Sequence, residues 1–219
     1  MSAPIVVINP NSTEAVTAAI DQAIEPLRMA GGPDIECLAL AEGPPGIESQ
    51  AHVEQVVQPV ARLVHSRDDA AAFVIACFSD PGLHVAREAT PRPVFGIAEC
   101  GMLTALTMGE HFGIISILAR SVPRHHRYVR QIGLSGRLAG DLPIGLGVVE
   151  LADADRTLDR LCVTGAKLRD DHGANVLVLG CAGMARYRPE IETTVGIPVV
   201  DPTQAAVTMA IGAVRLAEA

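Results

Sequence analysis

The fold is decided by the stretch Asn175-Val-Leu-Val-Leu-Gly-Cys181-Ala-Gly-Met184, in which a short apolar run ends at a cysteine in a turn of small residues. The same pattern occurs earlier in the chain, as Ala72-Phe-Val-Ile-Ala-Cys77-Phe-Ser-Asp-Pro-Gly82. Each run is rich in branched aliphatic residues and is bounded by polar residues, glycine or proline. This is typical of a strand buried on both faces of a parallel sheet. The sequence therefore predicts two buried strands that each end close to a cysteine.

The similarity between the two stretches extends to their flanks. Arg-Asp-Asp precedes each of them, at residues 67–69 and 169–171, and a second short strand follows each, at Pro93-Val-Phe-Gly96 and Pro198-Val-Val-Asp201. We therefore predict an α/β fold in which one αβαβ unit is used twice, as two lobes that each contain a mostly parallel sheet flanked by helices. Loops after the carboxyl ends of parallel strands form the ligand crevice. Two facing copies of the unit would bring the two cysteines to one cleft.

Length and composition fit an ordinary globular protein that acts on a small molecule. The chain has 219 residues, enough for a substantial core, and 49% of them are hydrophobic. The formal net charge of −8 argues against a nucleic-acid partner, whose phosphates require a basic surface. No apolar stretch reaches the ~18 residues of a membrane span. The chain opens on the strand-like Pro4-Ile-Val-Val-Ile8 and not on a signal peptide, so we expect a cytoplasmic protein without a membrane partner.

The cysteines favour thiol chemistry over metal binding. Their number, five, is odd and no pair has the spacing of metal ligands, so we predict neither a disulfide framework nor a metal site. We also predict no cofactor, because a phosphate-binding glycine loop is lacking and Lys167, the single lysine, lies on a polar helix face that does not suit a pyridoxal Schiff base. Three cysteines lack the strand-end position and are expected to be packing residues: Cys37, Cys100 and Cys162.

Two further turns are candidates for contact with a ligand. The expected strand Ile5–Ile8 runs into Asn9-Pro-Asn-Ser-Thr13, and such a strand-to-helix turn offers backbone N–H groups to an anionic group. A similar strand over residues 112–117 leads to Arg120 and Ser121, which occupy the corresponding helix entry. Both turns are expected at the same end of their sheets as the cysteines.

Other segments have mainly structural interpretations. The Gly/Pro-rich loop Glu42–Glu48 has the composition of a lid, although ordinary connections look the same, and a single helix is expected over residues 49–65. His125-His126 is expected to be a surface pair, because adjacent helix positions point in different directions. Leu142–Val149 is expected to be a strand, and its Gly145-Leu-Gly147 lacks the rest of a dinucleotide fingerprint.

The residues after Cys77 predict an activated thiol. Asp80-Pro81 has the pattern of an N-cap followed by proline at the first helical position, which places Cys77 just ahead of a helix N-terminus. The partial positive charge of that terminus would stabilise the thiolate and lower the pKa of the thiol below its usual value of ~8.5.

Two opposed thiols can invert a carbon centre. One thiolate removes a proton from an activated carbon on one face, and the other thiol delivers a proton to the opposite face. A single base tends to return the proton to the face that it left, so two groups are needed. Negative charge that develops on the substrate carbonyl needs nearby donors, and the candidates are the backbone N–H groups that follow each cysteine: Phe78, Ser79, Ala182 and Gly183.

Four segments together resemble a known family: Val7-Ile-Asn-Pro-Asn-Ser12, Val74-Ile-Ala-Cys-Phe-Ser-Asp-Pro-Gly-Leu83, Gly96-Ile-Ala-Glu99 and Val178-Leu-Gly-Cys-Ala-Gly-Met184. The chain resembles the Asp/Glu/hydantoin racemase superfamily, and its hydantoin racemase branch in particular, over nearly its whole length. The resemblance implies a cofactor-independent racemase with two pseudo-symmetric α/β lobes and the active site in the cleft between them. It also implies a homo-oligomer. Within each chain it implies residues 1–98 plus 206–219 as the first lobe and residues 99–205 as the second.

The resemblance also suggests residue roles. Cys77 and Cys181 match the acid–base pair of the family, Asn11 and Ser12 match its first-turn substrate-binding positions, and Ser79 lies beside the first cysteine. The branch commonly has Pro-Ser-Ile-Glu and Thr-Thr-Leu-Pro-Arg-Thr runs near the substrate. This chain has Pro45-Gly-Ile-Glu48 and Ser116-Ile-Leu-Ala-Arg-Ser121 instead.

The leading functional interpretation is racemisation of a 5-substituted hydantoin or of allantoin. The alternatives are an Asp/Glu-type amino-acid racemase, a maleate cis–trans isomerase, which also uses two cysteines, and a catalytically silent protein that binds a small ligand on the same fold. Arylmalonate decarboxylases of the superfamily keep only the second cysteine, so the presence of Cys77 argues against that chemistry.

Overall fold

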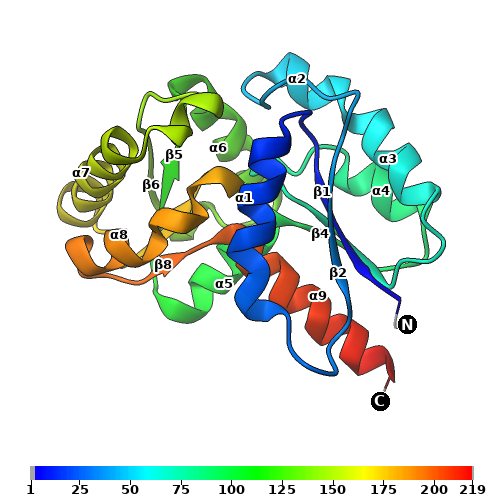
Figure 1. The fold of residues 1–219 in the computed structure, drawn as a ribbon. Coiled ribbons are helices and arrows are strands. Elements are labelled where there is room, and N and C mark those ends of the chain that lie inside the picture. Colours follow the sequence, from blue (N-terminus) through cyan, green and yellow to red (C-terminus); the bar gives the residue numbers. More distant parts are fainter. Residues whose placement is uncertain (1–2, 219) are drawn as a thin grey trace.

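A computed structural model describes residues 3–218 and shows two four-stranded parallel sheets side by side (Figure 1). The first sheet has the order β2-β1-β3-β4 and the second has the order β6-β5-β7-β8. The strands of the second sheet follow the same order as those of the first, so both lobes have the same topology. The predicted fold class, an α/β protein with two similar lobes, is confirmed. The strands are β1 (Ile5–Asn9), β2 (Ile35–Ala39), β3 (Ala72–Ile75), β4 (Val94–Gly96), β5 (Phe112–Ser116), β6 (Leu138–Pro143), β7 (Val176–Leu179) and β8 (Val199–Val200).

The two cysteine-bearing stretches form central strands. Every residue of β1, β3, β5 and β7 is buried, as the unbroken apolar runs predict. In register, Val7 of β1 faces Val74 of β3, and Ile114 of β5 faces Val178 of β7. The edge strand β2 is only half-buried along its length. The two strands that lead to the cysteines therefore sit in the interior of their sheets, where neighbours fix them on both sides.

Helices cover both faces of each sheet. In the first lobe α2, α3 and α4 pack on the outer face and α1 and α9 on the inner face; in the second lobe α7 and α8 are outer, and α5 and α6 cover the other face (Figure 1). The helices are α1 (Glu14–Ile24), α2 (Gln50–Gln55), α3 (Val57–His65), α4 (Leu83–Ala89), α5 (Ile97–Met108), α6 (Val122–Gln131), α7 (Ala154–His172), α8 (Arg188–Val195) and α9 (Pro202–Glu218).

Two helices cross between the lobes. α5 follows β4 of the first sheet but packs on β7 and β5 of the second, whereas α9 follows β8 of the second sheet and packs on β3, β4 and β1 of the first. The two helices also pack closely on each other, and a Cβ atom at Gly101 would lie only 2.8 Å from Cβ of Pro202. The predicted lobe boundaries at 98/99 and 205/206 fall in the first turn of α5 and of α9, and we propose them as the points at which the chain passes from one lobe to the other. Because each of these helices packs on the sheet of the other lobe, they hold the two lobes in a fixed arrangement around the cleft.

Two predicted elements differ from the structure. The strand expected over residues 142–149 is wrong: β6 ends at Pro143, and the following apolar residues are buried in a loop in which Gly145 and Leu146 donate backbone hydrogen bonds to the carbonyl of Ile117. Glycines between apolar residues imitate strand alternation here. The helix expected over residues 49–65 is divided at Val56 into α2 and α3. Pro59 lacks the N–H that a continuous helix would need.

Candidate active site

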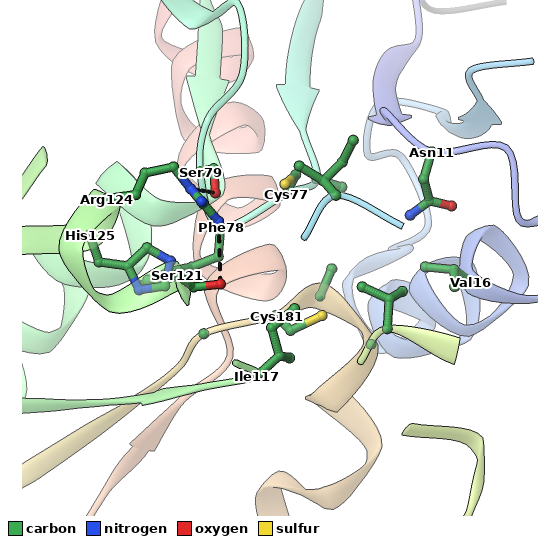
Figure 2. Close-up of a pocket in the computed structure, with 16 residues that line it drawn as sticks. Asn11, Val16, Cys77, Phe78, Ser79, Ile117, Ser121, Arg124, His125 and Cys181 are labelled. Carbon is green, nitrogen blue, oxygen red and sulfur yellow. Dashed lines mark hydrogen bonds between the residues drawn. The ribbon is translucent and has the colours of Figure 1, made fainter. Parts of the chain in front are cut away.

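A pocket lies between the lobes, at the carboxyl ends of β3 and β7. It brings together eight of the ten site residues expected from the sequence: Asn11, Cys77, Phe78, Ser79, Ser121, Cys181, Ala182 and Gly183. The remaining wall is formed by Val16, Ile47, Ala76, Ile117, Arg124, His125, Val148 and Gly180. Residues from both lobes thus build one pocket (Figure 2).

Cys77 and Cys181 occupy equivalent places in the two lobes. Each lies two residues beyond its strand, and the residue before each cysteine donates a backbone hydrogen bond of 2.8 Å to the neighbouring strand, from Ala76 to Ile8 and from Gly180 to Ile115. Figure 2 shows the two cysteines on opposite sides of the pocket. Both are only partly buried, so the pocket can present both thiols to a bound molecule.

The expected lowering of the Cys77 pKa is wrong. Burial raises the pKa of Cys77 to about 12 and that of Cys181 to about 11. The backbone N–H groups of Ser79 and Gly183 oppose this rise by hydrogen bonding to the sulfur atoms. The negative charge of Cys181 raises the pKa of Cys77 further. Desolvation of the thiols therefore raises their pKa values by more than the nearby backbone N–H groups lower them. The sequence-based expectation considered only the local chain and left this desolvation out.

Asp80 caps a different helix from the one expected. The helix after Cys77, α4, begins only at Leu83, while the Asp80 carboxylate accepts hydrogen bonds of 2.9 Å from the backbone N–H groups of Ala98 and Glu99, in the first turn of α5. Asp80 adopts a φ of +41° to make this contact. The turn that carries Cys77 is therefore anchored to the helix that crosses into the second lobe.

Asn11 is held so that its amide faces the pocket. Its Oδ1 accepts hydrogen bonds from Asn9 Nδ2 at 3.0 Å and from the backbone N–H of Thr13 at 2.9 Å. The amide nitrogen of Asn11 is on the pocket side in Figure 2, where it can donate to a ligand. Ser12 does not line the pocket, and its backbone N–H donates instead to the carbonyl of Pro44.

Arg120 also lies outside the pocket wall, where it holds the loop over residues 42–48. Its guanidinium donates to the Glu48 carboxylate at 2.6 Å, and the other oxygen of Glu48 accepts a hydrogen bond of 2.9 Å from the backbone N–H of Val148. Glu48 belongs to the first lobe and both partners belong to the second. Ile47 and Val148 themselves line the cavity, so the loop closes one side of the cleft.

Sequence reasoning missed His125, which is 4% exposed and lines the pocket, so the expected surface pair is wrong at this position. Its Nδ1 is hydrogen-bonded to Asp141 at 2.9 Å and to Ser116 at 3.0 Å, and its ring packs edge-on against Phe78 with centroids 5.2 Å apart. Four-residue spacing puts His125 on the same buried face of α6 as Ser121 and Val129. That spacing is the signal that could have identified it.

Arg124 was missed as well. It is 9% exposed, lines the pocket, and donates from Nε to Ser79 at 2.9 Å and from Nη2 to Ser121 at 3.3 Å. The hydrogen bond to Ser79 connects α6 of the second lobe to the turn after Cys77 in the first lobe (Figure 2). A charged side chain thus faces the same cavity as the two thiols.

Residues 3–218 lack two further features. No helix in this range has the length and apolarity needed to cross a bilayer. Over the same residues, no group of three His, Cys, Asp or Glu side chains is arranged to hold a metal ion.

Comparisons with known proteins point to one family. Residues 5–210 match the family described as Asp/Glu/hydantoin racemase. The chain is 35% identical to a hydantoin racemase of Paenarthrobacter aurescens, over 97% of this chain and 91% of the relative. Among solved structures, it is similar to allantoin racemase from Klebsiella pneumoniae, with a TM-score of 0.90 and 31% identity over 99% of this chain and 89% of the other. It is also similar to allantoin racemase from Pseudomonas fluorescens, with a TM-score of 0.93 and 28% identity over 98% and 92% of the two chains.

Proposed function

The chain belongs to the Asp/Glu/hydantoin racemase family and is a racemase, and we propose that it inverts the C5 centre of a 5-substituted hydantoin or a close relative such as allantoin. The observation that carries this proposal is the placement of Cys77 and Cys181 at equivalent positions on opposite sides of one cavity. The names of the relatives support the choice of a cyclic ureide as substrate.

The proposed reaction is a proton transfer across the pocket. The thiolate of one cysteine removes the C5 proton, the electron pair is delocalised onto the adjacent ring carbonyl, and the thiol of the other cysteine protonates C5 from the opposite face. The reverse direction uses the same groups with exchanged roles. The amide of Asn11 and the backbone N–H groups of Phe78 and Ala182 are our candidate donors to the enolate oxygen.

Electrostatic coupling of the two thiols suits this chemistry. Because the charge of Cys181 raises the pKa of Cys77, ionisation of one thiol disfavours ionisation of the other. Once one thiol has ionised, the other therefore stays protonated, and this state of one thiolate and one thiol is the one that transfer in one direction requires. C5 is already acidified by the neighbouring carbonyl, so we propose that no cofactor takes part.

We further propose a homo-oligomeric state, as the family resemblance implies, and a cytoplasmic location. All five cysteines are free thiols, the form that a reducing compartment maintains. Light scattering coupled to gel filtration tests the oligomeric state.

Incubation in heavy water tests the function. Single enantiomers of 5-alkyl hydantoins and of allantoin are expected to lose optical rotation and to take up one deuterium at C5, because the proton delivered comes from a thiol that has exchanged with solvent. Aspartate, glutamate and maleate are tested in parallel. Turnover of aspartate or glutamate alone would indicate an amino-acid racemase instead, and turnover of maleate alone would indicate a maleate isomerase. Binding of a hydantoin without deuterium uptake would indicate a protein that binds the ligand but does not catalyse the reaction.

The pH profile provides a second test. Since burial raises both thiol pKa values, to about 11 for Cys181 and about 12 for Cys77, only a small fraction of the free enzyme carries a thiolate at neutral pH. We expect kcat/KM for an alkyl hydantoin to rise by about ten-fold per pH unit from neutral pH to about pH 9. The uncatalysed rate is subtracted at each pH. A plateau that starts below about pH 8 would contradict raised thiol pKa values in the free enzyme.

A further inference from the structure

Arg124 is a buried cation without a carboxylate partner. Its two hydrogen bonds go to the neutral hydroxyl groups of Ser79 and Ser121, and none of the ion pairs in the described part of the chain includes it. Burial lowers its pKa. Arginine is rarely buried unless it is paired, because desolvation of the charge is costly. A guanidinium has five N–H donors, and these two bonds leave others for a ligand.

The surroundings of Arg124 carry an excess of positive charge. Arg120 and Arg127 both act on its charge; the first is neutralised by Glu48 and the second donates to the neutral amide of Gln50 at 2.8 Å. The negative charges that act on Arg124 are those of Cys77, when it is ionised, and of Asp141. Burial raises the pKa of Cys77 to about 12, so this thiol is mostly neutral, and the Asp141 carboxylate is occupied by hydrogen bonds to Ser116 and His125. In a chain with a formal net charge of −8, this site favours an anion.

Arg124 also stands where a substituent of the substrate could extend. A second pocket adjoins the first and shares with it the residues Phe78, Ser79, Arg124 and His125. Its far wall includes Gln50 and Arg127. A ring held between the two cysteines in the first cavity could direct its 5-substituent past Arg124 toward the second.

We propose that the substrate of this racemase is a hydantoin whose 5-substituent ends in a carboxylate, and that Arg124 binds this carboxylate. The inference rests on the proposed function and makes it more specific. Allantoin and alkyl hydantoins carry uncharged substituents and would add no carboxylate partner to the buried guanidinium. A substrate carboxylate would supply this partner through charge-assisted hydrogen bonds, with better geometry than two hydroxyl groups offer.

A pair of substrates matched in size tests the proposal. Hydantoin-5-propionate and its side-chain amide differ in charge but hardly in shape, and kcat/KM is measured for one enantiomer of each. The wild-type protein should prefer the acid by at least about ten-fold, and Arg124→Gln should lower kcat/KM for the acid by about ten- to a hundred-fold while affecting the amide far less. Arg124→Lys should retain part of the preference, since it keeps the charge.

The ratio of acid to amide is measured within one preparation, so it does not depend on the fraction of a variant that folds. Arg130→Gln is the matched control: it removes a positive charge from an exposed position of the same helix and should leave the ratio unchanged. Absence of an acid preference in the wild type would overturn the inference. So would an equal loss of both activities in Arg124→Gln, which would assign Arg124 to the reacting centre or to Cys77. In either case racemisation of the amide shows that the proposed function stands, whereas failure to racemise any hydantoin removes both.

Discussion

Cys77→Ser and Cys181→Ser are each expected to reduce racemisation by about 10²- to 10⁴-fold or more, the range that a lost acid–base group accounts for. A serine hydroxyl is far less acidic than a thiol and supplies almost no anion near neutral pH, so one face of the substrate loses its base and its proton donor. The remaining cysteine still lines its own side of the pocket, and in the proposed mechanism it reaches C5 from there. Each variant should therefore exchange deuterium into one enantiomer with retention of configuration, and the two variants should choose opposite enantiomers.

Polarimetry measures the loss of racemisation, and NMR of each enantiomer in heavy water measures the exchange. Cys162→Ser is the control. Cys162 lies on α7 and packs against the core of the second lobe, outside the cavity wall, so its replacement should leave the rate close to that of the wild type. Wild-type racemisation by either of the first two variants would refute the assignment of two bases, and exchange into the same enantiomer by both would refute their opposition across the pocket.

Gly180→Ala is expected to give the second largest effect. A Cβ atom at this position would lie 2.6 Å from the carbonyl oxygen of Ile115 and 3.1 Å from Cα of Ser116. Both are backbone atoms of β5, so the turn that carries Cys181 must move away from the sheet. We expect a loss of about 1–3 kcal/mol in the free energy of unfolding. The adjacent Cys181 would move with the turn. A displacement of about 1 Å should lower kcat by about 10²-fold.

Urea unfolding and steady-state kinetics on the folded variant separate the two consequences. Gly136→Ala serves as the matched control, because a Cβ atom there would meet no heavy atom within 4 Å. The equivalent position in the first lobe already carries a side chain, Ala76, which shows that the close approach is a property of the second lobe alone. If Gly180→Ala retained wild-type stability and kcat, the tight packing of the Cys181 turn on β5 would be wrong.

The sequence by itself determined the repeated architecture and the place of the two cysteines and of the residues that directly follow them. Both cysteine strands are continuous apolar runs because they are buried on both faces, and this burial is visible in the composition of each strand. The repeat then implies that equivalent strand ends face each other, which accounts for Cys77, Cys181 and the residues after them. The same local reasoning failed where glycine and apolar residues alternate in a loop, at residues 144–148.

Only the tertiary structure decided the electrostatics of the pocket. Burial, which raises the thiol pKa values, depends on how the loop that contains Ile47 and the loop that contains Val148 close over the cleft. Arg124 donates to Ser79, 45 positions away in the sequence. Asp80 caps α5 by accepting from Ala98, 18 positions away. These contacts join residues that no local pattern links. A strand or a helix follows from neighbouring residues, but the solvation and charge of a site depend on which distant groups the fold brings against it.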